Sequence, residues 1–383
     1  MFSPEFNLLR LALLKHGLVN PIEEARKIIA SDKIDWLEIL KRAKHHNIRP
    51  QLYELLKEIV SQEIPGWVKD ELGDSVRENM LRQLRNISEF FRIINLLETN
   101  NIAPIPFKGF WLANELYGNI GQRESGDVDL FIHIDNLDKI IELMPELDYK
   151  PETAGNNRFI EREKKLSAEF NFDKKDGEMV TSHFEFHWKI GSGLHSLDVG
   201  FNDLSSQIVN SSFQGHSVKV FNLSASFLLA IMHHGAKDNL SELRHILDVG
   251  MFLKKKDEID WQWVLSLARR FNMEKQVYTA MKLAADLTGC DLPESAEIFM
   301  KASSTSIVKL AANRLRQITL SPSQKSALWH ELDNLIFQLR SRTGLMVKVR
   351  LIKLSCMRIV IRHIVPANLH MRYRKLKEKR FAA

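Results

Sequence analysis

Cysteine is scarce in this sequence, which has only Cys290 and Cys356 among its 383 residues and no CxxC motif. The cysteine pattern predicts neither a disulfide framework nor a zinc site, and a reducing compartment fits it best. No run reaches the roughly 18 uninterrupted apolar residues that a membrane-spanning helix needs. The first residues carry no basic segment ahead of their apolar stretch and no small-residue cleavage site, so we expect a cytoplasmic protein that is neither secreted nor membrane-spanning.

The composition excludes disorder and fibrous classes, because 44% of the residues are hydrophobic and 27% are charged. A chain of this length exceeds one ordinary hydrophobic core, so we expect more than one packed region. Residues 1–85 show apolar side chains at three- and four-residue spacing, interrupted at Pro21, Pro50 and Pro65. This pattern predicts consecutive helices separated at the prolines.

Residues 86–222 contain strand-like patterns of apolar residues in addition to helical ones. VDLFIHI, at residues 128–134, is typical of a buried strand, and residues 166–173 and 180–190 are joined through an Asp-Gly turn as a hairpin would be. A further strand is predicted near residues 217–223. Helical spacing returns after a predicted N-cap at Ser224 and persists over residues 223–383. The predicted fold class is therefore α+β, with a small mixed β-sheet flanked by N-terminal and C-terminal helical regions.

Two acidic residues stand out on the first predicted strand. Side chains alternate between the faces of a strand, so Asp127 and Asp129 share one face while Val128 and Leu130 face the packing. Adjacent carboxylates repel and raise each other's pKa unless a cation lies between them. The pair therefore predicts a divalent-metal site, and neutralising Asp129 is expected to leave the stability of the metal-free protein unchanged or slightly higher.

The segment HFEFHWKI repeats this alternation one hairpin later. Phe184, Phe186 and Trp188 fall on one face, which is expected to be core, and Glu185 and His187 fall on the other. If this strand lies beside VDLFIHI, Glu185 completes a cluster of three carboxylates. Such a cluster can hold two Mg²⁺ ions, one at the attacking oxygen and one at the triphosphate and its leaving group.

These motifs carry a resemblance that spans roughly residues 86–190. FKG at residues 107–109, the Asp-Val-Asp at 127–129 and the strand ending in Glu-Phe-His-Trp at 185–188 resemble the bacterial family of uncharacterised nucleotidyltransferases within the DNA polymerase β-like superfamily. The resemblance implies a nucleotidyltransferase core that uses Mg²⁺ or Mn²⁺ and a nucleoside triphosphate. It assigns Asp127, Asp129 and Glu185 to metal binding and catalysis.

The same resemblance places Lys108 and Gly109 at a phosphate-binding turn. The alternative interpretation of Lys108 is a solvated lysine at an ordinary strand-to-helix turn. Arg123 is interpreted either as a phosphate contact or as a partner of Glu124 or Asp127. His187 either orients a metal ligand or packs beside its tryptophan neighbour.

The helices after the core carry a second polar group, composed of His233, His234, Lys237, Arg244, His245 and Asp248. Adjacent histidines point in different directions on a helix and no HExxH spacing is present, so packing with a polar rim is favoured over a metal site. Lys237 and Asp248 stay secondary candidates for contact with nucleotide or acceptor.

The C-terminal region is strongly basic, since eleven Lys or Arg residues from Lys348 to Arg380 face Glu378 alone. We expect either a helix with a solvated face or contact with anionic membrane or nucleic acid, with the part after His370 dispensable for folding.

The predicted function is transfer of a nucleoside monophosphate from an NTP to an unidentified small-molecule, saccharide or peptide acceptor, with release of pyrophosphate. The alternative is a non-catalytic binding or scaffold protein of the same fold that contacts membrane or nucleic acid through its basic C-terminus.

Overall fold

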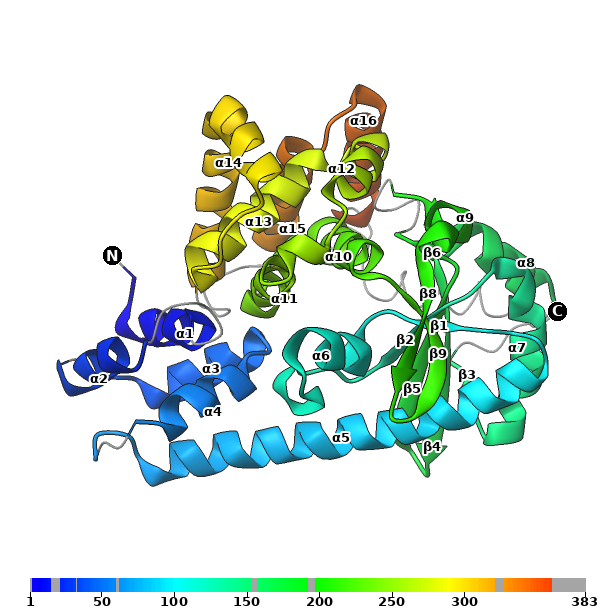
Figure 1. The fold of residues 1–383 in the computed structure, drawn as a ribbon, viewed down its shortest axis with the longest axis horizontal. Coiled ribbons are helices and arrows are strands. Elements are labelled where there is room, and N and C mark those ends of the chain that lie inside the picture. Colours follow the sequence, from blue (N-terminus) through cyan, green and yellow to red (C-terminus); the bar gives the residue numbers. More distant parts are fainter. Residues whose placement is uncertain are drawn as a thin grey trace.

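The computed structural model describes residues 2–14, 21–31, 33–59, 62–152, 157–191, 197–320 and 327–359. Helices fill the N-terminal part of the described chain, as the apolar spacing predicted. They are α1 (Pro4–Leu14), α2 (Ile22–Ser31), α3 (Trp36–His45), α4 (Arg49–Lys57) and α5 (Gly66–Thr99). Helix α5 is continuous across residues 85 and 86, where the first predicted region ends, and it runs along both the other N-terminal helices and the sheet (Figure 1).

The central sheet has the strand order β1-β2-β5-β4-β3. Its strands are β1 (Ile105–Pro106), β2 (Val128–Phe131), β3 (Lys150–Pro151), β4 (Glu169–Asp176) and β5 (Met179–His187). β4 and β5 form the predicted hairpin. β2 and β5 are parallel neighbours while the other pairs are antiparallel, so the sheet is mixed and the α+β class is confirmed.

The two faces of the sheet belong to two hydrophobic cores. Val128 and Leu130 pack on one face with the buried half of α5 and with Phe184 and Phe186 of β5, as the alternation predicted. Phe131 points to the other face, where it joins the core that the N-terminal and C-terminal helices share. Residue 129 lies on this second face because it shares the parity of residue 131. The candidate carboxylates therefore face the C-terminal helices.

Short elements surround the sheet. They are α6 (Gly109–Tyr117), α7 (Leu137–Leu143), α8 (Asn157–Leu166), α9 (Phe201–Leu204), β6 (Lys189–Ile190), β7 (Val199–Gly200), β8 (Ile208–Phe213) and β9 (His216–Phe221). The strand predicted near residues 217–223 is β9, but it pairs only with β8, which was not predicted, in a separate two-stranded sheet. A sharp turn at Gln214 and Gly215, both with positive φ, closes this hairpin.

The C-terminal part is helical, as predicted. It contains α10 (Leu223–Ile231), the π-helical turn η6 (Met232–Lys237), α11 (Leu243–Leu253), α12 (Trp261–Arg270), α13 (Glu274–Thr288), α14 (Glu294–Thr319), α15 (Ala327–Ser341) and α16 (Leu345–Ile359). The predicted N-cap at Ser224 is wrong: Asn222 caps α10 by accepting from the N–H of Ala225 at 3.0 Å, and Ser224 instead accepts from the N–H of Asp260 at 2.8 Å.

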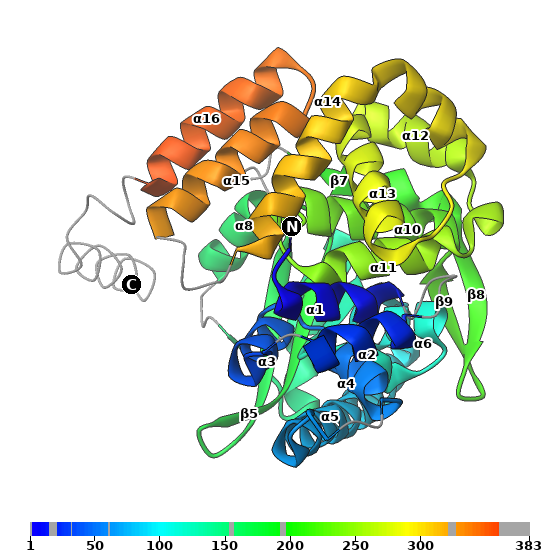
Figure 2. The ribbon, with the colours of Figure 1, turned by 90° about the vertical axis from the view of Figure 1, so that its left-hand side faces the viewer.

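The two helical regions pack on each other as well as on the sheet. Helix α1 contacts α13, and Figure 2 shows the N-terminal helices between α5 and the later C-terminal helices. The division into regions 1–85, 86–222 and 223–383 stays a prediction. Within the described residues, no helix combines the length and apolar character needed to cross a bilayer. The basic segment beyond Ile359, including everything after His370, lies outside the described residues.

Glu115 on α6 is a carboxyl group that the fold disfavours in its charged form. Burial raises its pKa to about 7, and its Oε2 accepts no hydrogen bond within the described residues. A carboxyl whose pKa is higher in the folded than in the unfolded state lowers stability as pH rises from about 4.5 through 7. We expect Glu115→Gln to increase the free energy of unfolding by roughly 1–3 kcal/mol at pH 8 and by much less near pH 4.5.

Urea unfolding at the two pH values measures this effect, with Glu142→Gln on the exposed face of α7 as the control. A gain that does not change between the two pH values would contradict the proposed cause.

Candidate active site

Two of the predicted carboxylates lie side by side on parallel strands. Asp129 of β2 and Glu185 of β5 are direct register partners. Asp129 is buried, and Asp127 immediately precedes β2 and is partly exposed. All three carboxylates act on the ammonium of Lys108, and the charges of Asp129 and Glu185 also act on Asp127. Asp129 and Glu185 therefore lie together on the helical side of the sheet, and Asp127 is close enough for their charges to act on it.

Cationic side chains already contact this carboxylate group. Lys108 Nζ lies 2.5 Å from Asp129 Oδ1. His187 Nε2 lies 3.0 Å from the same oxygen and 3.2 Å from Glu185 Oε2, so its N–H is shared between the two carboxylates. His187 Nδ1 lies 3.3 Å from Glu169 Oε2. His187 therefore touches the predicted ligands directly, in keeping with an orienting role.

The two aspartates differ in their electrostatics. The charge of Asp129 and, next, burial raise the pKa of Asp127, as the repulsion argument predicted. Burial would also raise the pKa of Asp129, but the Lys108 ammonium and the hydrogen bond from His187 lower it overall. The pKa of Asp129 is lowered because a cation, the Lys108 ammonium, compensates its charge. Asp127, unlike Asp129, forms no salt bridge with any described residue.

Buried amide side chains on α5 hold the loop that leads into β2. Asn79 Nδ2 donates to the carbonyl of Gly121 at 3.0 Å, and Gln83 Nε2 donates to the carbonyl of Ser125 at 2.8 Å. Both amides lie on one face of α5, since they are four residues apart. These contacts fix the backbone just before Asp127, and the sequence analysis did not single them out.

Gly109 begins helix α6 with a left-handed backbone, at φ +57°. A Cβ at this position would lie 3.0 Å from the carbonyl oxygen of Asp127, so the turn allows only a glycine without strain. The start of α6 therefore lies beside the backbone of Asp127. This geometry agrees with the predicted turn at Lys108 and Gly109.

Replacing Gly109 by alanine is expected to lower the free energy of unfolding by about 1–3 kcal/mol, because a left-handed non-glycine residue and a close approach are combined. The control is Gly66→Ala at the first residue of α5, where a Cβ meets nothing within 4 Å and φ is not positive. Thermal or urea unfolding of both variants measures the difference. Equal stability of the two variants would show that the turn relaxes freely.

A cavity of about 280 Å³ opens over Asp127 and Asp129. Its lining joins all three parts of the chain: Asn47, Arg49, Arg82, Lys108, Gly109, Arg123, Glu124, Ser125, Gly126, Asp127, Asp129, His233, His234 and Arg244. Two of these basic residues, Arg49 and Arg82, were not predicted, because helical spacing does not say which distant elements meet. Arg49 is held by Glu124, whereas Arg82 forms no salt bridge with any described residue.

A second cavity of about 400 Å³ adjoins the site through His187 and His233. Its wall is mixed, with apolar Leu166, Ile190 and Met232 as well as polar groups. Lys237, predicted as a cofactor contact, lines this cavity and lies 3.7 Å from Glu169. It therefore lies beside the second cavity and does not line the one over the carboxylates.

Arg123 has a partner that neither interpretation anticipated. Its Nε and one terminal nitrogen donate to the carboxylate of Asp248 at 3.0–3.1 Å, and both side chains are buried. The predicted pairing with Glu124 or Asp127 is therefore wrong. Asp248 also accepts from the hydroxyl of Tyr117 at 2.8 Å and contacts His234 Nε2 at 3.1 Å. The pair ties the loop before β2 to helix α11.

A known protein family matches most of this chain. The profile of a family described as uncharacterised nucleotidyltransferases matches residues 32–289, which contain the sheet, the carboxylates and both cavities. The chain belongs to this family. This confirms the family resemblance drawn from the sequence, and nucleotidyl transfer is the general activity that the family suggests.

Other comparisons add little to the family assignment. The antibiotic-resistance factor ANT(2'')-Ia, known from a solution structure, is similar over 49% of this chain and 92% of its own, at 11% sequence identity and a TM-score of 0.36. A likeness this distant supports no conclusion about function. No curated protein matches the sequence.

Proposed function

We propose that this nucleotidyltransferase transfers a nucleoside monophosphate from an NTP to a hydroxyl, amine or phosphate acceptor and releases pyrophosphate. The observation that carries the proposal is that Asp127 and Asp129 lie with the Gly109 turn in the wall of a cavity that is otherwise largely basic, and that Glu185 is the register partner of Asp129. Both features suit a bound triphosphate. A cation held by the carboxylates would stabilise the charge that develops at the reacting phosphorus, and N–H donors at a helix start bind phosphate oxygens.

The donor set fits a hard divalent cation. Carboxylate oxygens suit Mg²⁺ or Mn²⁺, and among the described residues Asp129, Glu185 and His187 place one ligand atom each within 4.8 Å of one another. The raised pKa of Asp127 reflects negative charge that a cation would relieve. We assign the ion to Asp127, Asp129 and Glu185, where it would supply charge stabilisation at the phosphates.

The remaining groups of the cavity would bind and orient the nucleotide. The N–H groups that begin α6 at Gly109 and the ammonium of Lys108 lie where phosphate oxygens would be held. Arg82 is a further candidate for phosphate binding, because its guanidinium has no salt-bridge partner among the described residues. Arg123 would act indirectly, by fixing the loop before β2 against α11.

The acceptor would enter through the second cavity, which meets the first at His233. Its mixed apolar and polar wall suits a small molecule, a saccharide or a peptide side chain, and Lys237 at its rim could contact an anionic group. On this proposal the helical regions 1–85 and 223–383 form the walls of a catalytic core at residues 86–222.

Thermal unfolding with each NTP tests the binding half of the proposal. We expect NTP together with Mg²⁺ to stabilise the protein, by about 2.7 kcal/mol at a hundred times the dissociation constant. Neither NTP alone nor Mg²⁺ alone should give the full effect. The absence of a shift with every NTP in the presence of Mg²⁺ or Mn²⁺ would contradict the proposal.

A further inference from the structure

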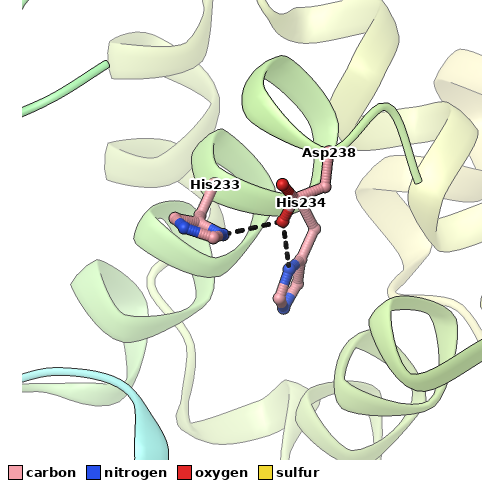
Figure 3. A group of neighbouring side chains, drawn as sticks. All are labelled: His233, His234 and Asp238. Atoms are coloured by element: carbon pink, nitrogen blue, oxygen red, sulfur yellow. Dashed lines mark ion pairs between the residues drawn. The ribbon is translucent and has the colours of Figure 1, made fainter. Parts of the chain in front are cut away.

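A second group of potential metal ligands lies on the wall of the same cavity, outside the carboxylate site. His233, His234 and Asp238 each place one ligand atom within 4.8 Å of the others. Both histidines lie in the π-helical turn η6, and Asp238 is its C-cap, whose N–H donates to the carbonyl of His233 at 3.1 Å. This wider turn brings both histidine rings to the Asp238 carboxylate, as Figure 3 shows. Short π-helical segments of this kind often occur at functional sites.

Among the described residues, the two nitrogens that face Asp238 have no hydrogen-bond partner other than this carboxylate. His233 Nδ1 lies 3.0 Å from Asp238 Oδ2, an ion-pair contact of hydrogen-bonding length, and His234 Nδ1 lies 3.8 Å from the same oxygen. Both atoms are buried, and the side chain of His234 is only 3% exposed. Two buried histidine nitrogens thus converge on one carboxylate oxygen and have no other partner, which is an arrangement that a shared cation would satisfy.

The tautomer of His234 favours metal binding at the same atom. Its Nε2 lies 3.1 Å from Asp248 Oδ2, and Asp248 is an anion paired with Arg123, so Nε2 carries the proton and donates it. Nδ1 is then left with a free lone pair directed at Asp238. A carboxylate that holds the far side of a histidine ring is a common support for a metal-binding histidine.

The neighbouring His245 belongs to the surroundings and not to the ligand set. Its Nδ1 accepts from the N–H of Glu242 at 3.4 Å, so its Nε2 is protonated and faces Asp238 at 3.6 Å as a donor. The ring of His245 stacks on that of His234, with centroids 4.2 Å apart. This contact holds the His234 ring in place.

The spacing of the ligand atoms suits a small tetrahedral ion. Zn²⁺ binds histidine nitrogen and carboxylate oxygen at about 2.0–2.1 Å, so two ligand atoms on a tetrahedral ion lie roughly 3.4 Å apart. The separations of 3.0 and 3.8 Å from Asp238 Oδ2 to the two histidines lie on either side of this value. Small side-chain adjustments would therefore complete the site.

We propose that His233 Nδ1, His234 Nδ1 and the Asp238 carboxylate bind one Zn²⁺-type divalent transition metal, with the fourth coordination position open to the cavity. Three protein ligands with an open position are typical of zinc sites that take water or substrate oxygen. His233 and His234 line the cavity that also contains Lys108 and Asp127, so a phosphate or acceptor oxygen could reach this position. The inference does not depend on nucleotidyl transfer. The proposed ligands are different residues from those of the carboxylate site, and imidazole nitrogen is a softer ligand than carboxylate oxygen.

The direct test is titration of tag-free, chelator-treated protein with Zn²⁺ by calorimetry and with Co²⁺ by visible absorption, both in saturating Mg²⁺ to occupy the carboxylate site. We expect binding of about one equivalent and the intense visible bands of four-coordinate Co²⁺. His233→Ala is expected to weaken binding at least about tenfold to a hundredfold. The exposed His216→Ala is the matched control and should bind like the wild type.

Asp127→Asn separates the two metal sites and should leave Zn²⁺ binding unchanged. If the wild-type protein fails to bind Zn²⁺ and Co²⁺ at millimolar concentration, the proposal is overturned, and that result needs no variant to fold. Zn²⁺ binding that persists in His233→Ala but disappears in Asp127→Asn would also overturn it, since the ion would then belong to the carboxylates.

Discussion

Asp129→Asn is expected to reduce nucleotidyl transfer at least about a hundredfold, because it removes a charge from the proposed cation site with little change in shape. Contrary to the expectation from repulsion alone, the variant should also be less stable without metal. The buried Asp129 carboxylate accepts from Lys108 and His187, and an amide compensates their charge poorly. We expect a loss of about 1–3 kcal/mol in the free energy of unfolding.

Initial rates of pyrophosphate release and urea unfolding in chelator measure the two effects separately. Asp135→Asn is the control, since Asp135 follows the same strand but its side chain is 82% exposed. Activity close to wild type in Asp129→Asn would remove this residue from the site. A stability equal to or above wild type would instead show that repulsion from Asp127 and Glu185 outweighs the contact with Lys108.

Arg123→Met is expected to lower the free energy of unfolding by about 3–5 kcal/mol, the usual effect of removing one partner from a buried ion pair. The side chains of Arg123 and Asp248 are only 2% and 0% exposed. Without the guanidinium, Asp248 would remain a buried anion supported by Tyr117 and His234 alone. The midpoint of urea unfolding at neutral pH gives the change.

The matched control is Arg77→Met on α5. Arg77 pairs with Asp74 at 3.1 Å, but these side chains are 72% and 64% exposed, so the expected loss is at most about 1 kcal/mol. The double variant Arg123→Met/Asp248→Leu should recover part of the lost stability, because no buried charge is left unpaired. Similar losses for Arg123→Met and Arg77→Met would show that water reaches the buried pair.

The central sheet and its carboxylates could be predicted because they depend on local alternation. The parity that places Phe184 and Phe186 in the core also places Glu185 on the opposite face. The turn at Gly109 was expected only from the family resemblance, and its positive φ was not predicted. Period-two patterning is recognised within a few residues, so the faces of a strand can be predicted from the sequence directly.

The partners of the charged groups could not be predicted in the same way. Arg123 and Asp248 are 125 residues apart in sequence, and which helix meets the loop before β2 is decided by packing. The cavity wall depends in the same way on Arg49 and Arg82 from the N-terminal helices. The π-helical turn at His233 also escaped prediction, because it changes the spacing on which the helical argument relied.

The central claim is that the carboxylate site transfers a nucleotidyl group, and one measurement tests it most directly. Purified protein is incubated with each of the four NTPs, Mg²⁺ or Mn²⁺ and candidate acceptors, and pyrophosphate and product masses are followed by mass spectrometry. We predict release of pyrophosphate together with a mass gain equal to one nucleoside monophosphate on an acceptor or on the protein. NTP binding without pyrophosphate or any mass gain, across all NTPs and acceptors, would contradict the claim and favour a binding protein of the same fold.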